Sequence, residues 1–245
     1  MAAGGEEVPL SGGRITAGVV RIADTVRRPT SASSPYVAVL LTHLERQGFS
    51  GAPRHLGTDE RGRDVLSHIP GEVPSRFQRW TDAQVAAAGR LLRNLHHATR
   101  TLPGAAPVVC HHDPGPNNTV FRTELPVAFI DFDTAAPGDP LEDLAYMAWT
   151  WCVSSRPDRG PVELQAAQVR LLADAYGLPP KDRPRLFDAI TERQTRNANW
   201  WRQRLPENHR PHDTTTEQIT DRITWSLREH NYTATHRTEF HAALH

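Results

Sequence analysis

Residues 108–145 read VVCHHDPGPNNTVFRTELPVAFIDFDTAAPGDPLEDLA. Two runs rich in β-branched and aromatic residues, 119–122 and 126–130, stand on either side of a short polar stretch at 123–125. Two such runs with a short connection are the pattern of a β-hairpin. We therefore expect the ends of the two strands to meet, and the residues just outside them to become neighbours.

Three polar residues occupy the ends of this hairpin. Asn118 precedes the first strand, Asp131 ends the second, and Asp113 lies five residues ahead of Asn118 in a loop rich in Pro and Gly. An amide oxygen beside a carboxylate is a hard oxygen site suited to Mg²⁺. A further carboxylate nearby can accept a proton from a hydroxyl group. Asp133 is a second metal candidate, because strand alternation puts it on the same face as Asp131 if the strand continues that far.

The spacing of His111, Asp113, Asn118 and Asp131 resembles the His-x-Asp-x-x-x-x-Asn and Asp pattern of protein kinases and their small-molecule relatives. The residues IDFD at 130–133 and GDPLEDLA at 138–145 resemble the aminoglycoside phosphotransferase family more than protein kinases, which carry Asp-Phe-Gly at the metal position. The resemblance implies an α+β, two-lobed protein-kinase-like fold with a small β-rich N-terminal lobe and a larger, mostly helical C-terminal lobe.

The resemblance also implies roles for these residues. Asp113 would be the catalytic base, Asn118 and Asp131 would hold Mg²⁺, and His111 would fix the shape of the loop. The run Cys110-His111-His112-Asp113 also suggests a transition-metal cluster. Structural zinc sites usually draw on two separated ligand pairs, and the sequence has no Cys-x-x-Cys, which argues against that alternative.

Asp139 and Asp143 begin the segment that follows the hairpin. Asp139 can cap a helix starting at Pro140, with Glu142 at its third position, and Asp143 is a first-turn acid favoured by the helix dipole. In the family that the sequence resembles, residues at these positions support the catalytic loop. We expect support from both, and no direct part in the chemistry.

The residues before this stretch predict the smaller lobe. Three strands within residues 1–30, a helix at 34–48 and strands at 54–57 and 64–68 give the order β-β-β-α-β-β. Ser34 would cap the helix. The break after Ile69 is the predicted boundary between an N-terminal nucleotide-binding lobe, 1–69, with a five-stranded sheet and one helix, and a C-terminal lobe, 70–245, with the catalytic loop, metal site and acceptor pocket.

The nucleotide contacts are predicted from this lobe. Gly12 and Gly13 lie between the first two strands, where kinase-like folds place a phosphate-covering loop, although a plain hairpin turn also explains them. His68 and Ile69 would form a hinge that meets the adenine edge, or a simple loop.

The third strand departs from the pattern of the resembling families, which pair a lysine there with a glutamate on the next helix. It offers Arg27 and Arg28, and the helix has Val37 where the glutamate would align, while its one acid, Glu45, lies near the far end. Arginine binds phosphate but is not equivalent to lysine. We choose Arg28 as the phosphate contact; exposed charges on a strand are the alternative for both.

The later residues predict helices at 81–99, 162–176, 183–205 and 215–231. Thr81 and Gln84 form a capping box for the first of these. Trp149, Trp151, Trp200 and Trp201 cluster by sequence in the helical part, and at helical spacing we expect most of them in the core. Acidic and basic residues are mixed in this part of the chain, so the sequence does not indicate an acidic funnel for a polycationic acceptor.

The composition sets limits on the class of protein. The chain has 245 residues and a formal net charge of zero, which argues against a nucleic-acid binder. Two cysteines, Cys110 and Cys152, fit reduced thiols. The first residues lack the charged and apolar regions of a signal peptide, and no apolar run is long enough to span a bilayer. We expect a cytoplasmic monomer or weak dimer that contacts neither membrane nor nucleic acid.

The function predicted from these residues is transfer of the γ-phosphate of ATP (or GTP), with Mg²⁺, to a hydroxyl of a small molecule, of which an antibiotic such as an aminoglycoside is one candidate. Two alternatives stay open. The absent Lys–Glu pair leaves room for a non-catalytic nucleotide-binding or immunity-type protein on the same fold. A kinase acting on a peptide hydroxyl would need an open groove, and the chain offers no obvious activation segment.

Overall fold

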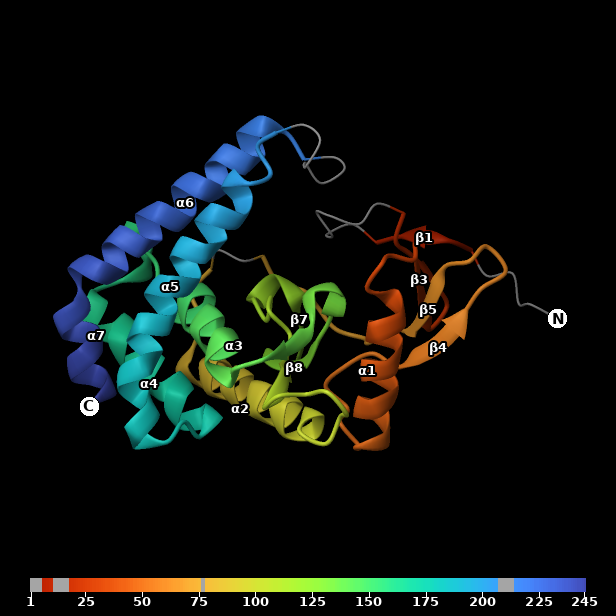
Figure 1. Ribbon diagram of the computed structural model, residues 1–245, viewed down its shortest axis with the longest axis horizontal. Helices are drawn as coiled ribbons and strands as arrows, with labels where there is room; N and C mark the ends of the chain where they lie inside the picture. Colours follow the sequence, from red (N-terminus) through yellow and green to blue (C-terminus); the bar gives the residue numbers. More distant parts are fainter. Residues whose placement is uncertain (1–5, 11–17, 76–77, 207–213) are drawn as a thin grey trace.

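A small β-rich lobe stands beside a larger helical part in the computed structural model, which describes residues 6–10, 18–75, 78–206 and 214–245 (Figure 1). The five strands of the small lobe form one antiparallel sheet in the order β1-β2-β3-β5-β4. The α+β class and the β-β-β-α-β-β order are confirmed. The strands are β1 (Val8–Pro9), β2 (Val20–Ile22), β3 (Thr25–Arg28), β4 (His55–Thr58) and β5 (Asp64–Ser67).

Helix α1 (Ser34–Arg46) lies between β3 and β4 in the chain. Ser34 is its first residue rather than its cap, and the preceding Ser33 occupies the cap position without a side-chain hydrogen bond. The prediction for Ser34 was therefore wrong: its hydroxyl donates instead to the carboxylate of Asp64 on β5. Four apolar residues face the core from this helix, as their spacing predicted: Val37, Leu40, Leu41 and Leu44.

The connection between the lobes pairs with the hairpin. Glu72 exchanges two backbone hydrogen bonds with Phe121, at 2.9 and 2.7 Å. Gly71 just before it has φ of 150°, and a side chain there would meet the Phe121 carbonyl oxygen at 2.3 Å. Only glycine allows this approach. The predicted boundary after Ile69 falls in this connection and stays a prediction.

Helix α2 (Asp82–Thr99) leads into the central stretch, and its capping box of Thr81 and Gln84 is present as predicted. The hairpin is also confirmed, as β7 (Thr119–Arg122) and β8 (Leu125–Phe129). The turn is shorter than predicted, because Thr123 and Glu124 alone form it, both with positive φ. Strand β8 therefore begins one residue earlier than predicted, at Leu125, and it also ends one residue earlier, at Phe129.

The helical part is built from α3 (Pro140–Met147), which continues as a π-helical turn η3 (Ala148–Cys152), and from α4 (Val162–Tyr176), α5 (Arg183–Arg202), α6 (Thr216–Thr235) and α7 (Arg237–Leu244). The predicted helix at 162–176 has the observed bounds, and α5 ends three residues earlier than predicted. Helix α6 begins one residue later and ends four residues later than predicted, and α7 was not predicted. In the residues that the structure describes, no helix is both long and apolar enough to cross a lipid bilayer.

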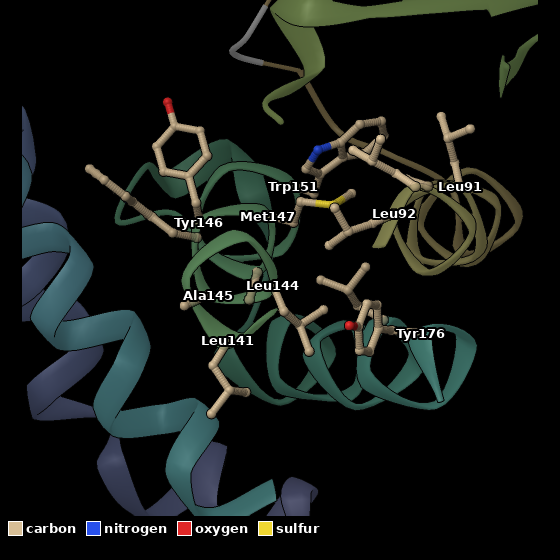
Figure 2. Close-up of a cluster of buried hydrophobic side chains, with 14 of the residues drawn as sticks. Leu91, Leu92, Leu141, Leu144, Ala145, Tyr146, Met147, Trp151 and Tyr176 are labelled. Carbon is tan, nitrogen blue, oxygen red and sulfur yellow. The ribbon is translucent and has the colours of Figure 1, made fainter. Parts of the chain in front are cut away.

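The core joins α2, α3 and α4. Figure 2 shows side chains from these helices meeting in one buried cluster, beside the π-helical turn. Burial of apolar surface of this kind contributes about 25 cal/mol per Å². The cluster thereby packs α2, which precedes the central stretch, against α3, which follows the hairpin. Its labelled members include Leu91, Leu92, Leu144, Met147, Trp151 and Tyr176.

Candidate active site

A short two-stranded sheet closes the segment that carries the predicted site. Strand β6 (Val108–Cys110) pairs with β9 (Ala136–Gly138) in antiparallel register. Every residue predicted to act in the chemistry or to bind metal lies between these two strands. Strand β9 was not predicted, because Pro137 and Gly138 argue against a strand in sequence reasoning.

His111 links the loop to the end of the hairpin. Its Nε2 lies 3.0 Å from the carbonyl oxygen of Ile130, and its Nδ1 accepts from the backbone N–H of Asp113 at 3.3 Å. These two bonds fit one neutral tautomer, with the proton on Nε2. The side chain is fully buried. His111 thus joins the residue before Asp131 to Asp113 itself, an arrangement suited to fixing the shape of the loop.

Asn118 contacts Asp113 directly. Its Nδ2 donates to the Asp113 carboxylate at 2.7 Å and to the Asp113 carbonyl at 2.9 Å. Its backbone carbonyl accepts from Ile130 at 2.9 Å, so the strand ends do meet as the hairpin pattern predicted. Its Oδ1 accepts from Asn117 at 3.1 Å. The amide therefore orients the carboxylate of Asp113 with its nitrogen and presents an oxygen on its other side.

Asp131 does not end a strand. Strand β8 stops at Phe129, and Asp131 has φ of 66°, the left-handed conformation, at the start of the 3₁₀ turn η2 (Phe132–Thr134). The strand therefore does not continue to Asp133, and the condition under which alternation would put Asp131 and Asp133 on one face is not met. Both carboxylates nevertheless reach the same cation, because the turn brings them to Arg28.

Arg28 comes from β3 and crosses to the larger lobe. It forms a short ion pair with Asp133, and its Nη1 lies 3.7 Å from Oδ1 of Asp131. Its side chain is only 11% exposed. Arg27 points to the other face of the sheet, where its Nε lies 3.7 Å from Oδ2 of Asp59. Strand alternation explains the split, and of the two arginines Arg28 is the one beside the predicted metal site.

The charge at Asp131 is only partly compensated. Burial among surrounding protein atoms raises the pKa of Asp131, Asp133 raises it further, and Arg28 opposes the shift. The side chain is nevertheless 45% exposed, so it stays accessible from solvent. Asp131 and the amide oxygen of Asn118 are hard oxygen donors that fit Mg²⁺. A bound divalent cation would offset both effects that disfavour the charged carboxylate.

Asp143 supports the loop from below. Its carboxylate accepts from the backbone N–H groups of His111 and His112 at 2.6 and 2.7 Å, and lies 3.0 Å from Nε2 of His96. It is fully buried. Burial alone would raise the pKa of Asp143, but the hydrogen bond and charge interaction with His96 outweigh it and the pKa is lowered.

Asp139 caps α3, because its side chain accepts a hydrogen bond from the backbone N–H of Leu141 at 2.9 Å. Glu142 forms no capping box and pairs with Arg196 at 2.7 Å.

A second group of potential metal ligands lies behind the loop. One ligand atom from each of His96, Cys110 and Asp143 lies within 4.8 Å of the others. These atoms already serve the protein, since His96 contacts Asp143 and the Cys110 thiol donates to the Asp139 carbonyl at 3.3 Å. Burial raises the pKa of Cys110 far above its usual range, and the neighbouring acids raise it further, whereas metal binding needs the thiolate. This group is therefore structural.

The residues predicted to contact the nucleotide from the small lobe are Gly12, Gly13, His68 and Ile69. Gly12 and Gly13 lie outside the described residues. His68 donates its backbone N–H to Asp24 at 2.8 Å, and burial, followed by the charge of Arg21, lowers the pKa of its imidazole. His68 and Ile69 are both half-buried at the end of the sheet, beside the connection between the lobes.

Several contacts of the loop were not predicted. Trp151 donates its indole N–H to the Pro114 carbonyl at 3.1 Å, and Arg193 of α5 donates to the His112 carbonyl at 2.8 Å. Sequence reasoning had no signal for either, since both partners are backbone oxygens brought near by tertiary packing. The His96–Asp143 pair had a faint signal, a histidine on the apolar face of α2 beside Leu92 and Leu95.

The tryptophans divide as expected. Trp149, Trp151 and Trp201 are buried, and Trp200 is 37% exposed. Trp200 borders a groove of about 550 Å³ along α5 and α6 whose lining is otherwise polar. The lining residues are Asp188, Thr191, Glu192, Thr195, Arg196, Asn199, Trp200, Gln203 and His230.

The fold and the arrangement of these residues define a protein of the kinase-like phosphotransferase class. Residues 97–187 match the model of the phosphotransferase enzyme family. A trifolitoxin immunity protein of Rhizobium leguminosarum bv. trifolii is 34% identical over 263 residues, covering 98% of this chain and 99% of that protein. The chain belongs to this phosphotransferase family.

Solved structures agree on the fold. A choline/ethanolamine kinase family protein from Mesorhizobium loti has a TM-score of 0.69 at 17% identity, covering 98% of this chain and 92% of that one. Spectinomycin phosphotransferase APH(9)-Ia, in complex with ADP and spectinomycin, has a TM-score of 0.66 at 11% identity, covering 96% and 93%. APH(2")-IIa, in complex with gentamicin, has a TM-score of 0.63 at 15% identity, covering 92% and 93%.

Proposed function

We propose that the protein transfers the γ-phosphate of ATP (or GTP) to a hydroxyl of a small molecule. The observation that carries this is the convergence of Asp113, Asn118 and Asp131 between β6 and β9, with Arg28 of the other lobe beside them. Phosphoryl transfer asks mainly for positioning and charge neutralisation, and this arrangement is suited to both.

The proposed chemistry divides among these residues. Asp113 orients the acceptor hydroxyl and takes its proton as the new bond to phosphorus forms and the bond to the nucleotide oxygen breaks. Asn118 and Asp131 would hold Mg²⁺, which would neutralise charge on the nucleotide phosphates when bound. Arg28 contacts a phosphate, and His68 and Ile69 meet the base. Solved relatives in complex with ADP and with AMP-PNP support a nucleotide as co-substrate.

The acceptor is proposed to bind on the helical part. Relatives in complex with gentamicin and with spectinomycin support a small polar molecule bearing hydroxyl groups. The groove beside Trp200 offers acidic, amide and aromatic groups that suit such a molecule. The test is a thermal-shift screen of ATP and GTP with and without Mg²⁺, followed by transfer of labelled phosphate to a panel of acceptors. Stabilisation by neither nucleotide would contradict the proposal.

A second candidate is protection against a toxin. It is favoured by the immunity protein that matches almost the whole chain at 34% identity. Protection can come from phosphorylating the toxin or from binding it without chemistry. Sensitive cells expressing the wild-type chain or the Asp113→Ala variant would separate the two: protection by both variants supports binding alone, and protection by the wild type alone supports phosphorylation.

A further inference from the structure

We propose that Asp133 is the positioning residue for Arg28. Its carboxylate holds the guanidinium at the nucleotide phosphates. Asp133 would thus replace the glutamate on the helix after β3 that pairs with the strand lysine in the resembling families. This inference rests on the proposed phosphotransferase function. It goes further by giving the phosphate-binding cation a partner and by removing Asp133 from the metal site.

Arg28 contacts Asp133 more closely than it contacts Asp131. Its Nη2 meets Oδ2 of Asp133 in a close, hydrogen-bonded ion pair, whereas its Nη1 lies 3.7 Å from Asp131. The Arg28 side chain is 11% exposed and that of Asp133 is 29% exposed. A cation with so little access to water needs a partner charge. Asp133 supplies it, which leaves the more distant and more exposed Asp131 available to a metal ion.

The position of Asp133 is fixed from both sides by His111. The ring of Phe132 lies 4.5 Å from the His111 ring, and the Thr134 hydroxyl donates to the His111 carbonyl at 2.9 Å. His111 in turn accepts from the backbone of Asp113. The ion pair therefore sets Arg28, which belongs to the other lobe, at a defined place relative to Asp113.

Helix α1 offers Arg28 no acid of its own. Its one acidic residue, Glu45, lies near its last turn and pairs with Arg54 at 3.7 Å. Asp64 lies opposite Arg28 across the β3–β5 ladder, but its carboxylate accepts a hydrogen bond from Ser34 at the start of α1. The helix that would supply a glutamate thus contacts β5 through a serine, and the partner of Arg28 comes from the turn after Asp131.

The choice of arginine follows from this geometry. A guanidinium is a rigid fork with five N–H donors, so one edge can pair with a carboxylate while another contacts phosphate. A lysine ammonium is a compact point charge on a flexible stem. Arg28→Lys should therefore fail to reproduce both contacts, even though the charge is kept.

The test is a double-mutant cycle on nucleotide affinity. Calorimetry would measure the Kd of ATP for the wild-type chain and for Arg28→Ala, Asp133→Ala and the double variant. We expect each single change to raise the Kd of ATP about tenfold. The double variant should have nearly the same Kd as the single variants, because each single change already removes the Arg28–Asp133 ion pair. Asp133→Glu should restore part of the affinity. The Mg²⁺ concentration for half-saturation should stay unchanged in Asp133→Ala and rise in Asp131→Ala.

Matched controls come from the other face of the same strand. Arg27→Ala and Asp59→Ala break a longer ion pair that points away from the site, with 3.7 Å between the Arg27 Nε and the Asp59 Oδ2, and Asp59 also accepts a hydrogen bond from Arg63. They should leave the ATP affinity at the wild-type value. If Asp133→Ala does not fold, as judged by circular dichroism, Asp133→Asn replaces it in the cycle.

Three results would overturn the inference. Additive effects of the two single changes would show that Asp133 and Arg28 act separately. A raised Mg²⁺ requirement in Asp133→Ala would make Asp133 a metal ligand. Tighter ATP binding by Asp133→Ala would show that the pair restrains Arg28. Failure of the wild-type chain to bind any nucleotide would instead overturn the proposed function, and this inference with it.

Discussion

The side-chain amide of Asn118 donates to the carboxylate of Asp113 across 2.7 Å. The residue proposed to bind the metal ion therefore also orients the proposed base. Its nitrogen and its oxygen serve different partners, because Oδ1 faces away from Asp113 and accepts from Asn117. Metal binding and base orientation can be separated by changing one atom of this side chain.

The change Asn118→Asp is expected to separate the two roles. It keeps an oxygen for the metal ion but replaces the donor with an acceptor beside Asp113, so the two carboxylates repel each other. We expect Mg²⁺-dependent ATP binding to persist while the rate of phosphate transfer falls about 100-fold. Calorimetry and single-turnover transfer measure the two quantities, and Asn118→Ala, which removes both atoms, should lower both. An equal loss of binding in both variants would contradict the separation.

Replacement of Asp113 tests the base. Asp113→Ala should lower the rate of transfer at least about 100-fold, the usual contribution of a positioned base, and leave the Kd of Mg·ATP close to the wild-type value. Asp113→Asn is the matched control for the hydrogen bond, since it keeps a side-chain oxygen for Asn118 to contact. Loss of nucleotide binding in both variants would show that Asp113 binds metal or nucleotide instead.

Replacement of Asp131 tests the metal assignment. Asp131→Ala removes a hard oxygen donor, so we expect the nucleotide affinity measured with Mg²⁺ to fall towards the affinity measured without it. A titration of Mg²⁺ at fixed ATP, followed by the thermal shift, gives the result. Glu45→Ala removes an acid that pairs with Arg54 near the end of α1 and should leave the titration unchanged. An unchanged curve for Asp131→Ala would remove Asp131 from the metal site.

Local patterns were sufficient to predict much of this molecule. The hairpin, the capping box at Thr81 and the order of strands around α1 follow from periodicity and turn chemistry within short windows. The same patterns placed Asp113, Asn118 and Asp131 near one another, because a hairpin joins its own ends. Contacts between residues next to a short connection can be read from sequence.

The contacts that were missed join distant parts of the chain. Arg28 and Asp133 are 105 positions apart, and His96 and Asp143 are 47 positions apart. No periodicity relates such residues, and only the packing of the lobes brings them together. Strand alternation could not place Asp133 either, because β8 stops at Phe129 and the chain turns at Asp131 in the left-handed conformation, for which an aspartate gives only a weak signal.

The tryptophans give a test of the helical core. Trp149 is fully buried and stacks on Trp225 with ring centroids 4.3 Å apart, whereas Trp200 is 37% exposed and carries Arg204 on its face. We expect Trp149→Ala to lower the free energy of unfolding by about 3–5 kcal/mol and Trp200→Ala by less than about 1 kcal/mol. Urea unfolding measures both. A change in acceptor KM confined to Trp200→Ala would support the groove as the acceptor site.

Asp143 gives a prediction for stability against pH. Burial would raise the pKa of this carboxyl group, but its contacts with His96 prevail and the pKa is lowered from its ordinary value in the folded chain. In the unfolded chain the group binds its proton first, so its contribution to stability is complete at neutral pH and is lost as the pH falls through the lowered pKa. Asp143→Asn leaves two buried backbone N–H groups and His96 with a poorer partner, and we expect a loss of about 3 kcal/mol near pH 7.

The difference between the wild-type chain and Asp143→Asn should stay constant above the ordinary pKa of an aspartate, about pH 4, and shrink as the pH falls from there through the lowered pKa of Asp143, because the unfolded chain then binds a proton that the folded chain does not. Urea unfolding of both chains across this range measures it. Asp139→Asn is the control, because Asp139 is an exposed helix cap whose replacement by another good capping residue should change the stability little. A difference that grew as the pH fell would mean that the folded chain holds Asp143 in its protonated form. The loop at His111 and His112 would then be held by a neutral acid rather than by a buried carboxylate.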